Sequence, residues 1–273
     1  MHVTDTTIEK LKIGTPLVMG KYGVRNDSQQ PVVWLKGTPN GDFITRDVVD
    51  FLPFDAMERE NMENEQARYM GNARYSVCNL LQFLNSEDES WFAPMHQYDT
   101  PPSGRNLDWS SGRYEEHFGF LHFFEEYETA SLKQNVQIVD GYSVVSMVRL
   151  PAVADLIGAN RFRLFAKKGI RPRASDDMIV GKPGLGFDDT TYVQFWTSDM
   201  NEFNGYATFI SRSASVSGSY PKVNYGVRPV CTISPETVVT FCDDGLYYIK
   251  PFVVEQNVST DEELFAFLGL AQP

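Results

Sequence analysis

The chain contains few cysteines and few histidines, which are the side chains that proteins use most often for zinc sites and disulfide frameworks. Its 273 residues include three cysteines and four histidines. Cys78, Cys231 and Cys242 are too few and too scattered for a disulfide framework or a metal knuckle, so we interpret them as buried thiols. His117 and His122 do not have the i, i+4 spacing that places two ligands on one helix face. The sequence therefore predicts no metal site, no cofactor and no catalytic histidine.

The sequence also lacks long apolar runs and an excess of basic residues. No stretch approaches the roughly 18 apolar residues of a membrane span, so we expect no membrane insertion. The first residues, MHVTDTTIEKLKIG, show no basic segment followed by an apolar one, which predicts synthesis in the cytoplasm without a signal peptide. The 24 Lys and Arg against 36 Asp and Glu give a formal charge of −12. Because such a chain repels phosphate backbones, nucleic acid is not an expected partner.

Aromatic residues, by contrast, are abundant. They make up 13% of the chain, with 42% hydrophobic and 22% charged residues overall. This composition is that of a globular protein and favours a β-rich or irregular fold with large side chains in its core. The length fits one large domain, or one domain with a small appendage.

Short apolar segments separated by turn residues predict many strands and few helices. We expect strands over 16–22, 31–37, 42–45, 142–150, 191–196, 206–210, 214–217 and 227–233. We expect helices over 74–86, 116–132 and 151–158, and long loops rich in proline and glycine over 94–114 and 167–190. Short strands, two to three helices and long irregular loops together indicate the α+β class.

The chain after about residue 236 has a different pattern. A hairpin is predicted with its turn at Asp243-Asp244-Gly245, followed by a short helix over 259–270 whose Thr260 and Glu263 have the spacing of a capping box. The apolar face of that helix predicts that it docks on its own domain or on a neighbouring subunit. We therefore divide the chain into a domain over 1–235, with a short N-terminal arm, and an extension over 236–273.

Two segments match enzyme motifs only in part. Gly181–Gly186, GKPGLG, lacks the Gly-Lys-Ser/Thr ending that holds phosphate and magnesium, so it indicates a turn. Ser213–Ser219, SASVSGS, lacks the Gly-x-Ser-x-Gly elbow of a serine nucleophile, so it indicates a polar strand and turn. Neither segment supports an enzyme.

Five sequence blocks occur in an order that resembles a known family. They are ITRDVVDFLPFDAME, GNARYSVCNLLQFLNSEDESWFAP, HQYDTPPS, GFLHFFEEYE and the closing YGVRPV at Tyr225–Val230. The set resembles a widespread, uncharacterised family of domains in Firmicutes and in their phages and prophages. That family is similar to the C-type-lectin-like fold of formylglycine-generating enzymes and of retroelement-diversified phage receptor-binding proteins. The resemblance covers about residues 10–235.

The resemblance carries over to individual residues. The first helix motif is matched by Arg74, Tyr75, Ser76, Asn79, Leu84 and Asn85, and the closing strand by Gly226, Val227, Arg228 and Pro229. The resemblance implies that Arg228 anchors the core through paired hydrogen bonds to backbone or to a carboxylate. Two departures are Phe83, where the family favours Trp, and the strand Phe195–Asp199, which lacks the family's Arg and Pro.

From this resemblance we expect a non-enzymatic phage or prophage virion protein with a C-type-lectin-like fold of short twisted strands. It implies a receptor-binding or adhesion protein on the virion surface, a homo-oligomer that contacts other virion proteins and binds a host-surface glycan or protein. A purely structural virion subunit, such as a capsid decoration, head fibre or tail or baseplate component, is the alternative. A formylglycine-generating-type oxidase is a remote alternative, because Cys231 and Cys242 are not a closely spaced pair and no histidine triad is present.

The ligand-binding residues are expected within 191–230, where Tyr and Trp stand among Asn, Ser and Gly, a composition typical of binding surfaces. Ordinary strands joined by turn residues explain this composition equally well. In C-type-lectin-like folds the segment before the closing strand faces the ligand. We therefore expect six residues to lie together on the exposed side of the strand array: Trp196, Asp199, Asn204, Tyr220, Asn224 and Tyr225.

Overall fold

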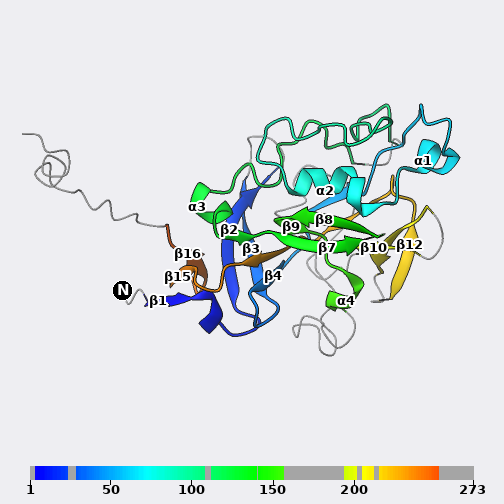
Figure 1. Cartoon of the computed structure of the whole chain (residues 1–273). Helices are drawn as coiled ribbons and strands as arrows, with labels where there is room; N and C mark the ends of the chain where they lie inside the picture. Colours follow the sequence, from blue (N-terminus) through cyan, green and yellow to red (C-terminus); the bar gives the residue numbers. More distant parts are fainter. Residues whose placement is uncertain are drawn as a thin grey trace, which may run out of the picture.

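The computed structural model describes residues 4–23, 29–107, 112–139, 141–156, 194–201, 205–211 and 215–251. In these residues strands predominate and the helices are short, so the protein has a mixed α+β structure (Figure 1). The predicted α+β class is thereby confirmed. No helix in the described ranges is long and apolar enough to cross a membrane.

Nine of the described strands form the larger sheet, and most of its neighbours run antiparallel. In order they are β1 (Thr4–Thr7), β15 (Val238–Phe241), β16 (Tyr247–Ile249), β2 (Pro16–Tyr22), β3 (Gln30–Lys36), β4 (Asp42–Thr45), β14 (Val230–Ile233) and β6 (Leu132–Lys133), with β9 (Val148–Arg149) also paired to β14. The strands predicted over 16–22 and 42–45 coincide with β2 and β4.

The hairpin predicted around Asp243-Asp244-Gly245 is present, because β15 and β16 pair antiparallel across this turn and Gly245 adopts a φ of 80°. It joins the larger sheet through β1 and β2. The helix predicted over 259–270 lies outside the described residues, and the boundary at residue 235 stays a prediction.

A smaller sheet of five strands holds the segment in which binding residues were expected. Its order is β12 (Val216–Ser219), β11 (Ala207–Ile210), β10 (Phe195–Met200), β13 (Asn224–Val227) and β5 (Asp50–Pro53). β10 and β13 run parallel, and the other neighbours run antiparallel. A separate two-stranded ribbon is formed by β7 (Asn135–Val139) and β8 (Tyr142–Ser146).

The helices are shorter than the sequence predicted. They are α1 (Glu65–Met70), α2 (Asn79–Leu84), α3 (Glu126–Thr129) and α4 (Val153–Leu156), with 3₁₀ turns at Ile8–Lys10 and Tyr75–Val77. The helix predicted over 74–86 is interrupted because Cys78 is extended, and its sulfur caps α2 by accepting the Leu81 N–H. The helix predicted over 116–132 is wrong except at α3. Near the start of the predicted range, Gly119 and Phe120 donate to the carbonyls of Asp88 and Phe83 and not to carbonyls of a helical turn of their own.

The main core lies between the sheets and the long loops and is dominated by aromatic rings. Phe83 is fully buried and packs edge-on against Trp91, Tyr114 and Tyr22. Such edge-to-face pairs add to the free energy gained from burial. The abundance of aromatic residues is therefore explained by this core.

Two chain segments run side by side through both large sheets, and we call them the seam. The first is 42–53, containing β4 and β5, and the second is 224–233, containing β13 and β14. The prediction of one strand over 227–233 is wrong, because Arg228-Pro229 separates two strands in different sheets. Between the paired strands, Thr45 N–H donates to Pro229 and Val49 N–H donates to Val227. β13 and β14 each have partners on both sides within their sheets, as expected for central strands.

Gly226 and Arg228 show why the closing motif needs these residue types. A Cβ on Gly226 would lie 2.9 Å from the Gln194 carbonyl oxygen and 3.0 Å from the Val48 side chain, so a larger residue would push the segments apart. Arg228 is buried and donates to the carbonyls of Thr45 at 2.9 Å and Arg46 at 3.3 Å. Burial lowers the pKa of its guanidinium to about 10, which still leaves it charged at neutral pH. The expected anchoring role of Arg228 is confirmed.

We predict that Arg228→Met lowers the free energy of unfolding by about 2–4 kcal/mol, because two carbonyls at the seam lose a charged donor. Urea unfolding followed by circular dichroism measures this change. The matched control is Arg46→Met at an exposed side chain, which should change stability by less than about 0.5 kcal/mol. Equal small effects of both substitutions would contradict the anchoring role.

A buried polar network fixes the chain after β5 to α2. The Asp55 carboxylate is almost fully buried and accepts the backbone N–H groups of Asn72 at 2.7 Å and Asn79 at 2.9 Å. The Asn79 side chain accepts the Ala56 N–H and donates to Asp99 in the long loop. Burial raises the pKa of Asp55 well above its ordinary value, and nearby Asp99 adds to this rise, while the two N–H donors oppose it.

We predict that Asp55→Asn destabilises the fold by about 1–3 kcal/mol, because its NH₂ group would face one of these backbone donors. The folded-state pKa of Asp55 lies above its unfolded value of about 4, so folding favours the protonated form. Its contribution to stability is full below about pH 4 and is lost as the pH rises toward the folded-state pKa. The advantage of wild type over the variant should therefore shrink with rising pH in urea unfolding.

The control for this pH dependence is Asp5→Asn. A hydrogen bond from Lys250 lowers the pKa of Asp5, so its contribution to stability is lost as the pH falls, the opposite direction to Asp55. A wild-type advantage over Asp55→Asn that grows with pH would show that the buried carboxyl is ionised at low pH and would refute the prediction.

Candidate ligand-binding site

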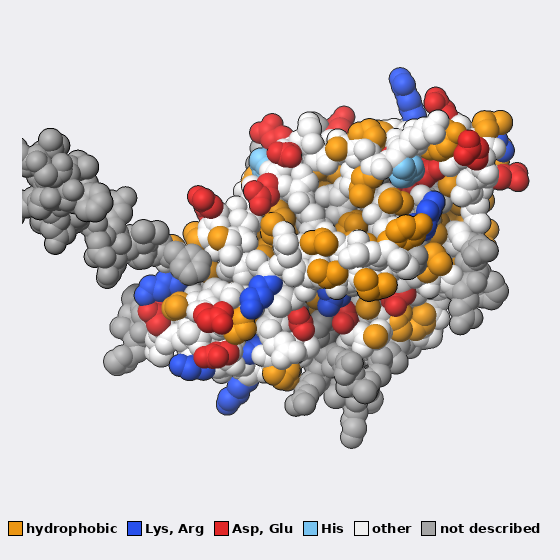
Figure 2. Space-filling model, viewed as in Figure 1, with side chains coloured by type: hydrophobic (Ala, Val, Ile, Leu, Met, Phe, Trp, Pro, Cys, Tyr) orange, Lys and Arg blue, Asp and Glu red, His pale blue; other side chains and the backbone are white. Residues whose placement is uncertain are grey.

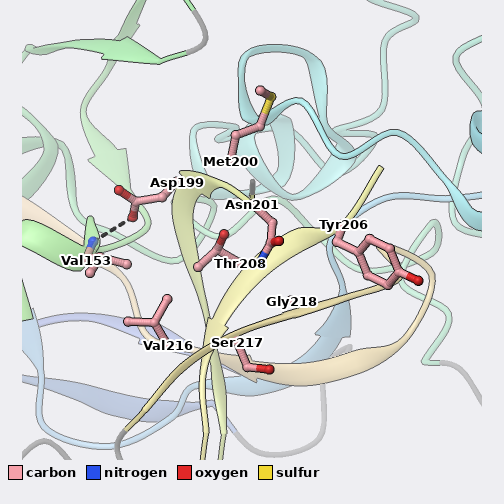
Figure 3. A pocket seen from close by; sticks show the side chains of 9 residues that line it. All are labelled: Val153, Asp199, Met200, Asn201, Tyr206, Thr208, Val216, Ser217 and Gly218. Carbon is pink, nitrogen blue, oxygen red and sulfur yellow. Dashed lines mark hydrogen bonds between the residues drawn. The ribbon is translucent and has the colours of Figure 1, made fainter. Parts of the chain in front are cut away.

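A cavity of about 670 Å³ lies beside β10, β11 and β12 in the smaller sheet (Figure 3). Its volume is within the range of about 300–1,000 Å³ typical of small-molecule sites. The described residues that line it are Val153, Asp199, Met200, Asn201, Tyr206, Thr208, Val216, Ser217 and Gly218. Polar, aromatic and small apolar groups thus share one hollow, and their chemistry suits a polar ligand with some apolar surface.

The strand alternation explains why this hollow is polar. Successive side chains of a strand point to opposite faces of its sheet. On β10 and β11, Trp196 and Phe209 belong to the main core, whereas Phe195 and Ile210 form part of a small apolar cluster on the other face. Thr208 lies between Phe209 and Ala207, both in the main core, so it shares the second face. That face carries the cavity.

Thr208 and Gly218 lie opposite each other in the register of β11 and β12. Thr208 is 2% exposed, and its hydroxyl oxygen has no hydrogen-bond partner among the described residues. A Cβ on Gly218 would lie 2.4 Å from the Asn201 amide nitrogen, so glycine is what allows the Asn201 side chain to lie over this strand. The buried Thr208 hydroxyl and the Asn201 side-chain amide therefore both belong to the lining of the cavity over β11 and β12.

Asp199 supplies the carboxylate of the cavity. It accepts the Val153 N–H at 2.6 Å at the start of α4, as Figure 3 shows. Burial raises the pKa of Asp199, and Asp155 nearby adds to the rise, whereas hydrogen bonds from the Val153 N–H and the Thr197 hydroxyl oppose it. No Lys or Arg is among the described residues that line the cavity.

Tyr206 forms one side of the cavity and is held in place by Tyr220. The two rings stack with centroids 4.8 Å apart and an interplanar angle of 26°, and the Tyr206 hydroxyl donates to that of Tyr220 at 3.1 Å. Both side chains are half-buried. The Tyr206 ring is therefore rigid before any ligand arrives, which reduces the entropy lost on binding.

The prediction that Trp196 lies on an exposed surface is wrong. Trp196 is 0% exposed, and its indole N–H donates to the Leu52 carbonyl at 2.9 Å. Tyr225 is half-buried, and its ring contacts Trp196 and Phe209 with centroids 4.6 Å and 4.3 Å away. The aromatic composition of this segment therefore reflects packing at these two positions, because both point to the main core.

The other predicted residues have different positions. Asp199 lines the cavity, and Tyr220 stands behind Tyr206. Asn224 is half-buried and accepts the Gly112 N–H at 2.7 Å, which ties a long loop to β13. Asn204 lies outside the described residues. The structure thus brings together Trp196 with Tyr225 and places Asp199 in the cavity, but it does not bring these residues onto one exposed face.

The sequence reasoning missed Tyr206, Thr208 and Gly218 as candidates. The polar, glycine-containing segment Ser213–Ser219 predicted a strand and turn, but not which strand it pairs with. Without the pairing of Thr208 with Gly218, no residue type in it indicated a site. The described part of the chain contains no group of three or more His, Cys, Asp or Glu that could hold a metal ion.

In comparisons with protein-family models, with curated proteins and with solved structures, no match to this chain was found.

Proposed function

We propose that this protein is a non-enzymatic virion surface protein of a phage or prophage, with a C-type-lectin-like domain that binds a host-surface glycan or protein. The observation that carries the proposal is the cavity on β10–β12, which combines a rigid tyrosine with amide, hydroxyl and carboxylate groups. Such groups supply the stacking surface and the oriented hydrogen bonds that small-molecule and glycan recognition needs. The virion location and the fold family rest on the five ordered sequence blocks.

The state of the cysteines favours a binding function over a formylglycine-type oxidase. Copper needs thiolate ligands, and burial raises the pKa of the Cys78 and Cys231 thiols well above their ordinary value. Cys242 lies on the β15–β16 hairpin and is partly exposed. These environments suit structural thiols.

One observation favours the second candidate function, a purely structural virion subunit. The outer face of the β7–β8 ribbon carries Val136, Ile138 and Val145, which are 65%, 73% and 57% exposed. Figure 2 shows hydrophobic side chains gathered over this ribbon. A neighbouring subunit of a virion assembly would bury such a surface.

The proposed binding function predicts that purified protein binds to cell-wall preparations or surface glycans of Firmicutes hosts. Tyr220→Ala should weaken this binding by about 1–3 kcal/mol, because Tyr206 loses its stacked support, with little loss of folding stability. Tyr225→Ala is the matched control, since it removes a ring packed on Trp196 and should lower the melting temperature by several degrees instead. A glycan array, binding to cells and thermal unfolding measure these effects.

Absence of binding to every host surface and array glycan, combined with incorporation of the protein into assembled particles, would replace the proposed function by the structural-subunit candidate. The genes beside the coding sequence provide a separate check on the virion location. Capsid or tail genes would support it, and an operon of metabolic enzymes would contradict it.

A further inference from the structure

We propose that the cavity on β10–β12 binds an uncharged pyranose ring, with the Thr208 hydroxyl as its buried hydrogen-bonding group. This inference deepens the proposed function and rests on it, since it names the class of ligand that the cavity takes. Three observations carry it: an unpartnered buried hydroxyl, the charge of the lining and a supported tyrosine ring.

The Thr208 hydroxyl is the first observation. A polar group that is buried without a partner costs about 1–3 kcal/mol, so such groups in folded proteins are normally satisfied by protein, water or ligand. Thr208 is 2% exposed, lines the cavity and has no partner among the described residues. The oxygen itself is covered, so a ligand hydroxyl that displaces the atoms covering it gains a hydrogen bond that the protein does not make itself.

The charge of the lining is the second observation and selects against acidic ligands. Asp199 is the one charged side chain among the described residues of the lining, and Asp155 lies close enough to raise its pKa. No described lining residue is a cation and the chain charge is −12, so the described part of the cavity offers a ligand carboxylate or phosphate repulsion from Asp199 and no balancing positive charge. This charge disfavours an acidic ligand, and the amide and hydroxyl groups of the lining suit a neutral ligand rich in hydroxyl groups.

The Tyr206 ring is the third observation. Tyr220 covers one face of this ring, and Tyr206 also lines the cavity. Aromatic rings pack against the apolar C–H face of a pyranose, while its equatorial hydroxyls point sideways toward hydrogen-bonding groups. Polar groups of this kind are provided by Asn201, Asp199 and Thr208. One sugar ring can therefore pack its C–H face on Tyr206 and direct its hydroxyls to these polar groups.

The experiment is a binding titration of the full chain by saturation-transfer NMR and calorimetry. The probes are methyl glycosides of glucose, galactose, mannose and N-acetylglucosamine, compared with glucuronic acid and N-acetylneuraminic acid. We expect at least one neutral glycoside to bind and the acidic sugars to bind at least about tenfold more weakly. Thr208→Val should weaken the neutral sugar by about tenfold or more without lowering stability, because the lost hydroxyl has no protein partner in the described residues.

Thr237→Val is the matched control. Thr237 is also 2% exposed with a hydroxyl that has no partner in the described ranges, but it lies beside β15 in the other sheet and does not line the cavity. Its substitution should leave sugar binding unchanged. Thr208→Ser keeps the hydroxyl and should retain most of the affinity, which keeps the test valid if the valine variant fails to fold.

Gly218→Ala tests the same part of the cavity from β12, where Gly218 lies opposite Thr208. Its Cβ would meet the Asn201 amide at 2.4 Å, so Asn201 must move and the affinity for the neutral sugar should fall. Tighter binding of an acidic sugar, or equal loss of affinity in Thr208→Val and Thr237→Val, would overturn the inference. Binding to host cells that is unaffected by Thr208→Val would overturn the inference and leave the proposed function standing, whereas absence of any host binding would refute both.

Discussion

The arrangement of both large sheets depends on the seam, where 42–53 and 224–233 run past each other from one sheet into the other. Arg228 holds this crossing because its buried guanidinium binds carbonyls of the opposite segment. Gly226 allows the segments to approach, and Pro229 ends one strand before the next begins. The position of β10 follows from β13 of the seam, and the positions of β11, β12 and the cavity follow from β10.

The two faces of the smaller sheet lie in different environments. The face with Trp196, Phe209 and Tyr225 packs into the main core, so substitutions there act through folding. The opposite face has a small apolar cluster at one end and polar groups beside α4. The proposed ligand would therefore bind on a face that does not pack into the main core, and the proposed contacts between subunits would use the exposed β7–β8 ribbon.

Local patterns in the sequence predicted the local structure well and failed where distant contacts decide. The strands at 16–22 and 42–45 and the turn at Gly245 follow from alternation and turn chemistry, and the anchoring role of Arg228 was expected from the family resemblance. The helix over 116–132 was wrong because the backbone at Gly119 and Phe120 bonds to another segment. Asp199, predicted as a polar turn residue of the binding segment, lines the cavity. Trp196 was misassigned because composition does not reveal which face of a strand is buried. The pairing of Thr208 with Gly218 requires the register, which no residue type in the sequence indicates.

The seam also determines how the molecule transmits mechanical tension. β1 and the β15–β16 hairpin lie at one end of the molecule and β12 lies at the other (Figure 1). A pull between β1 and β12 must pass from the larger sheet into the smaller one. At the seam the peptide backbone itself crosses twice, through Arg46–Val49 and through Arg228–Pro229. Covalent bonds therefore share this load with hydrogen bonds, so the junction between the sheets resists force better than two sheets held together by side-chain packing alone.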